Sequence, residues 1–277
     1  MTVRALRAME PGEVLVAEDV ARAVPETVLG ILTRLRDNGH AAYVVGGSLR
    51  DVLLGRVAHD WDMTTDARPD RLLELFPGAA YENAFGTVAI PAGGTLHQVT
   101  TFRSDHDYAD FRRPHRVEFG GRVEDDLARR DFTVNAIAWG WAAGSDMPAL
   151  VDPSGGRADI ARRTLRAVGD PDARFREDAL RMLRAVRLAA TLGFEIEPAT
   201  LAAIAENAPL AAHLSGERIA AELDRLLAAE RPSVGLRLAS DTGLVHVVIP
   251  ELDAQRGIRQ NKVPGEDLWD HTLRTVD

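Results

Sequence analysis

Two carboxylates in the segment His59-Asp-Trp-Asp62 have a spacing that suits metal-dependent chemistry. Side chains two residues apart on a β-strand project from the same face, and we expect a strand from Ala58 to Met63. Carboxylate oxygens are ligands that Mg²⁺ prefers, and two such ions can align the reacting groups of a phosphoryl transfer and neutralise their charge. We therefore predict that Asp60 and Asp62 are catalytic residues that bind two Mg²⁺ ions. Because Asp-x-Asp is also common in solvated loops, the pair alone does not decide the function.

A second group of residues, just upstream, is suited to binding phosphate. The apolar run Tyr43-Val-Val45 predicts a buried strand that ends at Gly46-Gly47, where the main chain can approach a ligand closely. Ser48 is suited to cap a helix, and Arg50 falls in the first turn of that helix. Main-chain amides at a helix start, together with a guanidinium group, can bind a triphosphate. A glycine pair after a strand is often a plain turn, but the order strand, glycine pair, helix, Asp-x-Asp is more specific than either motif.

This order resembles the head domain of the class II nucleotidyltransferases, which comprise the CCA-adding tRNA nucleotidyltransferases and the bacterial poly(A) polymerases. Seven further segments match family motifs in the family's order: Thr64-Thr-Asp-Ala67, Phe85-Gly-Thr-Val88, Thr100-Thr-Phe-Arg103, Arg129-Arg-Asp-Phe-Thr-Val-Asn-Ala136, Asp152-Pro-Ser-Gly-Gly156, Glu177-Asp-Ala-Leu-Arg-Met-Leu-Arg-Ala-Val-Arg187 and Gly216-Glu-Arg-Ile-Ala-Ala-Glu-Leu223. The resemblance implies an α+β fold. It consists of an N-terminal nucleotidyltransferase head, with a small mixed β-sheet backed by helices, followed by an all-helical neck and body.

The resemblance also implies a function, which is template-independent addition of CMP and AMP from CTP and ATP to the 3′ end of tRNA. Gly47, Arg50 and Arg130 match family positions that contact the incoming nucleotide. The family usually supplies a third carboxylate from a later strand, whereas this chain has Gln98 at that position. A glutamine there is either a weak ligand or a strand residue without metal contact. The resemblance implies neither a membrane nor an obligate protein partner.

Asp178, Arg181, Arg184 and Arg187 recur every three residues, and we expect them to form a stripe on a helix from Phe175 to Leu192. On an arbitrary helix this would be an ordinary charged face, but the resemblance implies that the stripe is the family's protein template for base selection. Cytosine and adenine place an amine donor beside a ring-nitrogen acceptor, and a carboxylate and a guanidinium group can pair with these two groups. Uracil and guanine reverse that order and would leave both side chains unpaired. We expect the first two residues to select C and A, and the last two to reach phosphates or ribose.

Several alternative functions share parts of this pattern. An A-adding tRNA nucleotidyltransferase or a poly(A) polymerase would have the same head motifs. A small-molecule adenylyltransferase would share the glycine pair and the Asp-x-Asp motif, but it would not need the Arg184 and Arg187 stripe. A fourth alternative is an RNA-binding module without catalytic activity. The intact Asp60 and Asp62 argue against this alternative, whereas Gln98 in place of a third carboxylate is compatible with it.

Hydrophobic patterning predicts the elements that must position these residues. Helices are expected at Pro25 to Gly39, Pro69 to Phe76, Leu127 to Trp139, Pro198 to Asn207, Gly216 to Ala229 and Ser233 to Ser240. Strands are expected at Thr87 to Ile90, Leu96 to Phe102 and Val117 to Phe119. Helical spacing replaces strand patterns from Ala161 onward. We therefore expect a catalytic head at 1–160, a helical neck with the nucleotide-selecting helix at 161–232, and the start of a helical body at 233–277.

Two polar segments carry further expectations. Arg103 to Arg116 is charged and poor in core residues, which indicates a mobile loop. In the family this loop acts as a lever between C and A addition, so its presence favours addition of the full CCA end or of A. Asp267 to Leu273 resembles the opening of an HD-type helical domain, and we expect the chain to be truncated there. We assign no metal role to His271.

Composition limits the class of protein. The 277 residues have a net charge of −9, 45% are hydrophobic, and none is cysteine, which excludes disulfides and zinc–thiolate sites. No stretch approaches the roughly 20 apolar residues of a membrane span, and we expect a cytoplasmic enzyme. The overall charge opposes indiscriminate polyanion binding, but the segment from Arg162 to Arg187 contains eight arginines and four acids. Such a local basic stripe can bind RNA.

Overall fold

The structure is a computed structural model that describes all residues except 1–16, 84–85, 109–113, 262 and 264. The described residues fall into two compact units. The first lies within Met1–Asp107 and Pro114–Arg162, and the second lies within Tyr108–Arg113 and Arg163–Asp277. The division into head, neck and body at residues 160 and 232 stays a prediction.

The first unit is built on a mixed seven-stranded sheet with the strand order β3-β4-β5-β2-β1-β8-β9. Its strands are β1 (Ala42–Val45), β2 (Asp62–Thr65), β3 (Ala80–Asn83), β4 (Thr87–Ala92), β5 (Thr95–Thr101), β8 (Ala138–Trp141) and β9 (Ala149–Val151). The β2–β5 pair is parallel and the other strand pairs of this sheet are antiparallel. The expected α+β fold with a mixed sheet is confirmed, as are the strands expected at β4 and β5, which pair as a hairpin.

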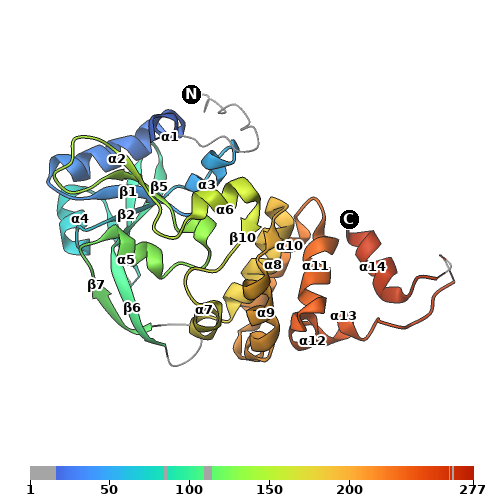
Figure 1. Cartoon of the computed structure of the whole chain (residues 1–277). Coiled ribbons are helices and arrows are strands. Elements are labelled where there is room, and N and C mark those ends of the chain that lie inside the picture. Colours follow the sequence, from blue (N-terminus) through green and yellow to red (C-terminus); the bar gives the residue numbers. More distant parts are fainter. Residues whose placement is uncertain (1–16, 84–85, 109–113, 262, 264) are drawn as a thin grey trace. The chain divides into compact units, whose positions relative to one another are not determined.

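Helices complete the first unit (Figure 1). They are α1 (Ala17–Ala23), α2 (Glu26–Asp37), α3 (Gly47–Leu53), α4 (Pro69–Leu75), α5 (Val123–Ala128), the 3₁₀ turn η1 (Thr133–Asn135) and α6 (Gly156–Arg162). α2 buries Val28, Ile31, Leu32 and Leu35, whose spacing puts them on one side of the helix, and it packs against β1. All four residues of β1 are buried, so the central strand is anchored in the core. The expected helices at α2 and α4 are confirmed.

Two expected elements in this unit are wrong. The strand expected from Ala58 begins only at Asp62, because its antiparallel partner β1 ends opposite at Val45 and offers no further main-chain partner. The helix expected over Leu127 to Trp139 is replaced by α5, η1 and the buried strand β8. A short apolar run is compatible with either a helix or a buried strand, and here pairing with β1 decides for the strand.

The segment expected to be a loop from Arg103 to Arg116 also differs. β6 (Arg103–Tyr108) and β7 (Pro114–Phe119) pair as a two-stranded sheet, and residues 109–113 lie outside the described residues. Strand pairing uses main-chain donors and acceptors, so a polar sequence does not exclude it. The lever role of this segment stays a prediction.

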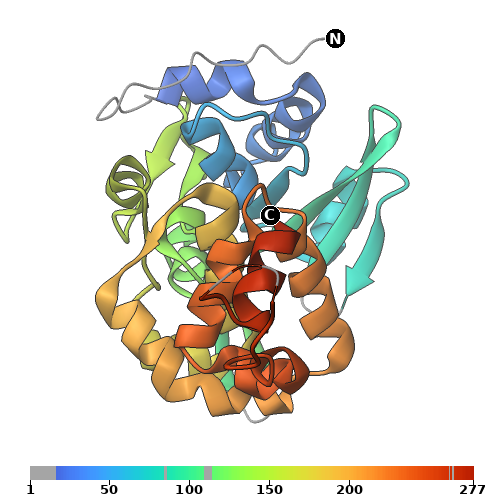
Figure 2. The ribbon, with the colours of Figure 1, turned by 90° about the vertical axis from the view of Figure 1, so that its right-hand side faces the viewer.

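The second unit is helical except for one short parallel pair, β10 (Thr164–Leu165) with β11 (Glu195–Ile196), which the sequence did not indicate. Its helices are α7 (Pro171–Glu177), α8 (Leu180–Leu192), α9 (Pro198–Asn207), the 3₁₀ segment η2 (Ala208–His213), α10 (Gly216–Leu227), α11 (Pro232–Asp241), α12 (Leu244–Val248), α13 (Pro250–Asp253) and α14 (Leu268–Val276). Figure 2 shows these helices in yellow to red, and α8 packs against both α10 and α11. The expected helices at α9, α10 and α11 are confirmed.

The single helix expected from Phe175 to Leu192 is wrong. It breaks into α7 and α8 at Asp178, whose backbone is extended (φ −149°, ψ 105°). The Asp178 carboxylate accepts a hydrogen bond from the Leu180 amide (3.1 Å), as a capping side chain does at a helix start. No helix in the described part of the chain is long and apolar enough to cross a membrane.

Candidate nucleotide-binding site

A glycine turn after β1 brings together residues from three parts of the first unit. Gly46 has φ 79° and ψ −142°, a combination almost restricted to glycine. A β-carbon built on it would lie 3.1 Å from Nη1 of Arg130 and 3.6 Å from Oδ2 of Asp62. The register explains the second approach, since Asp62 pairs with Val45. Two of the predicted site residues therefore meet at this turn.

Asp60 and Asp62 lie at the entry to β2. Asp60 precedes the strand, so the expectation that both carboxylates lie on it is wrong for Asp60. Both residues are exposed on either side of Trp61, which is buried. This alternation turns the two carboxylates toward solvent while the indole packs in the core. Both side chains thus remain accessible to a ligand.

Gln98 occupies the strand position next to Asp62. β5 runs parallel to β2, with Met63 opposite Val99, so the residues one step earlier, Asp62 and Gln98, are neighbours on one face. The Gln98 amide nitrogen donates to Oε1 of Glu82 on β3 (2.7 Å). Among the described residues no three His, Cys, Asp or Glu side chains gather in a way that could hold a metal ion. The strand position next to Asp62 therefore presents a neutral amide.

Arg130 is held in place by a buried acid. Asp126 on α5 is about 1% exposed and accepts hydrogen bonds from Nη2 of Arg130 (3.2 Å) and from Nε and Nη2 of Arg129 (3.0 and 2.6 Å). Burial raises the pKa of the Asp126 carboxyl, but the charges and hydrogen bonds of Arg130 and Arg129 outweigh burial, so its pKa is lower than usual. The two arginines follow the end of α5. We had expected them at the start of a helix, and this expectation is wrong. Because they lie at the C-terminal end of α5, the helix dipole favours their positive charge.

Arg50 is oriented by two acceptors. Its Nε and Nη2 donate to Oδ1 of Asp51 (2.9 and 2.8 Å), and its Nη1 donates to Oδ1 of Asn135 (2.7 Å). Asn135 in turn donates to Oδ1 of Asp131 (3.1 Å), so a buried acid holds the acceptor of Arg50 in place. A β-carbon on Gly47 would lie 3.5 Å from the Arg50 guanidinium group, which places the two predicted residues in contact.

The base-selecting pair in the second unit has an arrangement that the sequence did not predict. Nη2 of Arg218 on α10 donates to both carboxylate oxygens of Asp178 (3.0 and 2.8 Å). Arg181 on α8 instead donates to Glu177 (2.7 Å) and to the carbonyl oxygen of Arg174 (3.2 Å). Asp178 therefore sits in the break before α8 and is oriented by a residue 40 positions later.

Arg184 and Arg187 approach a single buried acid on α10. Nε of Arg187 donates to Oε2 of Glu222 (2.6 Å), and Nη1 of Arg184 lies 4.0 Å from Oε1. The Arg187 side chain is 14% exposed, so its guanidinium group is largely enclosed. Contact with a nucleotide in this conformation would have to use the guanidinium nitrogens that do not bind Glu222.

Four residues that contact predicted site residues were missed by sequence reasoning. They are Asp126, Asn135, Arg218 and Glu222, each of which orients a predicted residue. Three of them, Asn135, Arg218 and Glu222, lie in segments that match family motifs. Their partners could not be assigned because most of them are far away in the sequence.

Comparisons with known proteins show which family this chain resembles. A family model described as the poly A polymerase head domain matches residues 42–166, and one described as a probable RNA and SrmB-binding site of polymerase A matches residues 193–256. A CCA-adding enzyme of Geobacillus kaustophilus is 47% identical over 220 residues, covering 79% of this chain and 53% of that protein. One of Lacticaseibacillus paracasei is 44% identical over 231 residues, covering 83% and 56%.

A solved structure is similar in both sequence and fold. The crystal structure of Bacillus stearothermophilus CCA-adding enzyme in complex with CTP has 43% identity and a TM-score of 0.72, and it is matched over 79% of this chain and 52% of that chain. The chain spans about half the length of the curated relatives it matches. Two matching family models, these relatives and a shared fold establish its family. The chain belongs to the family of class II CCA-adding tRNA nucleotidyltransferases and bacterial poly(A) polymerases.

Proposed function

We propose that this chain carries the catalytic and nucleotide-selecting parts of an enzyme that adds CMP and AMP from CTP and ATP to the 3′ end of tRNA. The observation that carries the proposal is the meeting of Asp62 and Arg130 at Gly46, which puts a carboxylate and a guanidinium group beside an open main-chain turn. Relatives at 44 to 47% identity are named CCA-adding enzymes. The solved relative at 43% identity is described in complex with CTP.

Asp60 and Asp62 would hold Mg²⁺. Their donor set fits this ion, because both are exposed carboxylates and Mg²⁺ prefers oxygen ligands. When bound, the metal supplies positive charge that favours a deprotonated 3′-hydroxyl and offsets charge on the phosphates. Gln98, beside Asp62, would add a neutral oxygen at most, so the two aspartates provide the anionic ligands of the proposed site.

Arg130 and Arg50 would bind the triphosphate. Nη1 of Arg130 points to the Gly46 turn while its Nη2 is anchored on Asp126, so the guanidinium group is oriented before a ligand arrives. Arg50 is likewise oriented by Asp51 and Asn135 beside Gly47. Guanidinium groups that are oriented in advance lose less side-chain entropy on binding phosphate oxygens.

Asp178 and Arg181 would read the base. The Asp178 carboxylate can accept from the exocyclic amine of cytosine or adenine, and Arg181 can donate to the ring nitrogen. UTP and GTP would face the carboxylate with a carbonyl oxygen, leaving both groups unpaired, which is a strong penalty in an enclosed site. Selection of C and A would then need no nucleic-acid template. Such an enzyme acts on tRNA, and we propose the cytoplasm as its location.

Product sizing tests the proposal. The protein is incubated with tRNA that ends at the discriminator base, in CC or in CCA, together with each labelled nucleoside triphosphate. We expect two CMP additions to the first tRNA, one AMP addition to the second and none to the third. AMP addition to the CC-ended tRNA without CMP addition to the first would indicate an A-adding enzyme. A long AMP tail on the CCA-ended tRNA would indicate a poly(A) polymerase. Lack of any incorporation would contradict the proposal.

A further inference from the structure

Three arginines of the second unit surround one carboxylate. Glu222 on α10 accepts from Nε of Arg187 at 2.6 Å through Oε2. Its other oxygen, Oε1, lies 4.0 Å from Nη1 of Arg184 and 3.9 Å from Nη1 of Arg225. The last two distances exceed hydrogen-bond length, so the two guanidinium groups lie near the carboxylate without being bound to it by these atoms.

The four side chains form an inner pair and an outer pair. Glu222 and Arg187 are 5% and 14% exposed, and together they make a largely enclosed ion pair. Arg184 and Arg225 are 34% and 65% exposed, and the Nη1 atom of each lies about 4 Å from the same oxygen of Glu222. The outer pair therefore presents two neighbouring guanidinium groups to whatever binds at this face.

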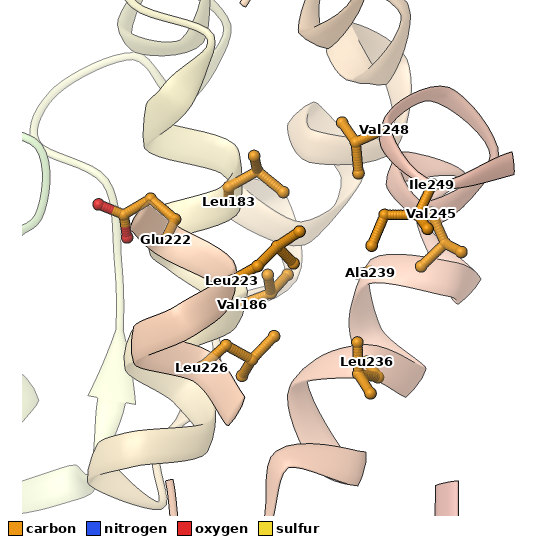
Figure 3. Close-up of a pocket in the computed structure, with 10 residues that line it drawn as sticks. All are labelled: Leu183, Val186, Glu222, Leu223, Leu226, Leu236, Ala239, Val245, Val248 and Ile249. Atoms are coloured by element: carbon orange, nitrogen blue, oxygen red, sulfur yellow. The ribbon is translucent and has the colours of Figure 1, made fainter. Parts of the chain in front are cut away.

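The charged face is separated from the apolar packing of the same helices. Figure 3 shows the Glu222 carboxylate pointing away from Leu183, Val186, Leu223 and Leu226, which line a cavity of about 10 Å³ with residues of α11 and α12. The apolar side chains thus hold α8 against α10, while the Glu222 carboxylate, which also lines this cavity, points away from them. The helix packing fixes the spacing of Arg184 and Arg225, because the two residues come from the two packed helices.

The cluster has more positive than negative charge. Burial lowers the pKa of the Arg187 guanidinium below its usual value, the Glu222 carboxylate opposes this shift, and repulsion from Arg184 and Arg225 adds to it. The single carboxylate therefore does not offset the charge that gathers around it. An anion placed between the two outer arginines would relieve this repulsion.

We propose that Arg225 and Arg184 bind one backbone phosphate of the RNA substrate, with the Arg187–Glu222 pair as the buried support of this site. The inference rests on the proposed function for the presence of an RNA substrate. A phosphodiester has two unesterified oxygens and can accept from two guanidinium groups at once. The RNA backbone is the proposed source of the phosphate because Arg225 lies outside the stripe that the resemblance assigns to nucleotide selection. Arg184 belongs to that stripe and is one of the two residues that we expect to reach phosphates or ribose.

Salt-dependent RNA binding tests this site without any chemistry. The affinity of the chain for a 3′-fluorescent tRNA acceptor-stem hairpin is measured by anisotropy from 50 to 300 mM KCl, with no nucleoside triphosphate. Each phosphate contact contributes about 0.7 to 0.9 to the slope of log K against log salt. We expect Arg225→Ala to weaken binding by about three- to tenfold at low salt and to reduce the slope by about this one contact.

The matched control is Arg22→Ala in the first unit. Arg22 is 70% exposed and contacts Asp19, three residues earlier, as Arg225 contacts Glu222. The control variant removes the same charge, and we expect its slope to equal that of the wild type. Arg225→Lys should keep the charge and recover part of the affinity. Thermal unfolding of each variant shows whether a loss of RNA affinity comes from misfolding. If Arg225→Ala is misfolded, the salt slope of Arg225→Lys decides whether the site binds RNA.

Each outcome decides the assignment. An unchanged slope for Arg225→Ala, or an equal loss in Arg22→Ala, overturns the proposal. A titration with CTP distinguishes the other source of phosphate, since weaker CTP binding with unchanged RNA binding would assign the cluster to the nucleotide. Absence of RNA binding by the wild type also overturns the site. The proposed function itself fails only if nucleotide incorporation is missing as well.

Discussion

The carboxylate of Asp178 accepts hydrogen bonds from Nη2 of Arg218 on both of its oxygens, although the two residues are 40 positions apart. A second bond from the Leu180 amide to Oδ1 ties the same carboxylate to the start of α8. Asp178 is thus oriented by Arg218 on α10 and by the main chain, whereas Arg181 on α8 donates to Glu177. The acceptor proposed to read the base depends on the packing of α10 against α8.

Arg218→Ala should reduce base selection. Without the guanidinium group the Asp178 carboxylate loses its orientation, and we expect the preference for CTP over UTP to fall by about tenfold, since a hydrogen bond to a charged group contributes about 1.5 to 3 kcal/mol. The measurement is the ratio of kcat/KM for CTP and UTP. Asp178→Ala should shift the same ratio in the same direction. If Asp178→Ala lowers the use of all nucleotides equally, the pair is only a scaffold.

Asp60→Ala and Asp62→Ala should each reduce incorporation to below a few per cent of wild type, because each removes an anionic ligand of the proposed metal site. Both side chains are exposed, so stability should change by less than about 0.5 kcal/mol. RNA affinity in the absence of nucleotide should stay within about twofold. Substantial activity in both variants would reject the assignment, and a large drop in Tm would show that the loss has a structural cause.

Gly46→Ala should cost about 1 to 3 kcal/mol of stability, because its φ of 79° and ψ of −142° are sparsely populated by other residues. The added methyl group would also meet Arg130 at 3.1 Å and displace it, so we expect at least a tenfold loss of incorporation. Gly30→Ala is the control. Gly30 is exposed within α2 and has no atom within 4 Å of a built β-carbon, so alanine there should stabilise the fold by about 0.5 to 1 kcal/mol. Urea unfolding compares the two, and equal stabilities would contradict the role of the turn.

Asp126→Asn should destabilise the first unit by about 3 to 5 kcal/mol at pH 7, because it leaves Arg129 and Arg130 without their buried partner. The folded-state pKa of Asp126 lies below its unfolded value of about 3.9. The stability that its ionised form contributes is therefore fully present above about pH 5, and it is lost as the pH falls through the folded-state pKa. The difference in unfolding free energy between wild type and Asp126→Asn should stay constant from pH 8 to 5 and narrow below pH 4. A difference that is independent of pH down to pH 3 would contradict the ionised pair.

Local sequence determined the features that form between residues close together in the chain. The apolar run before Gly46 predicted a buried strand, and the glycine pair predicted the break that ends it; both are present. The helical spacing at α2, α4, α9, α10 and α11 was equally readable. Each of these features depends on contacts within a few residues or on a periodic apolar face, which the order of residues specifies directly.

Tertiary structure decided the features that depend on partners distant in sequence. β2 begins at Asp62 because β1 ends opposite it, and Trp139 lies in a strand because β8 pairs with β1. Asp178, at the break before α8, accepts a hydrogen bond from Arg218 on α10. Arg187 on α8 donates to Glu222, which also belongs to α10. The sequence named the side chains that could do chemistry. Which oxygen each guanidinium group binds was decided by helix and strand packing, because hydrogen bonds are short and directional and depend on the final placement of both partners.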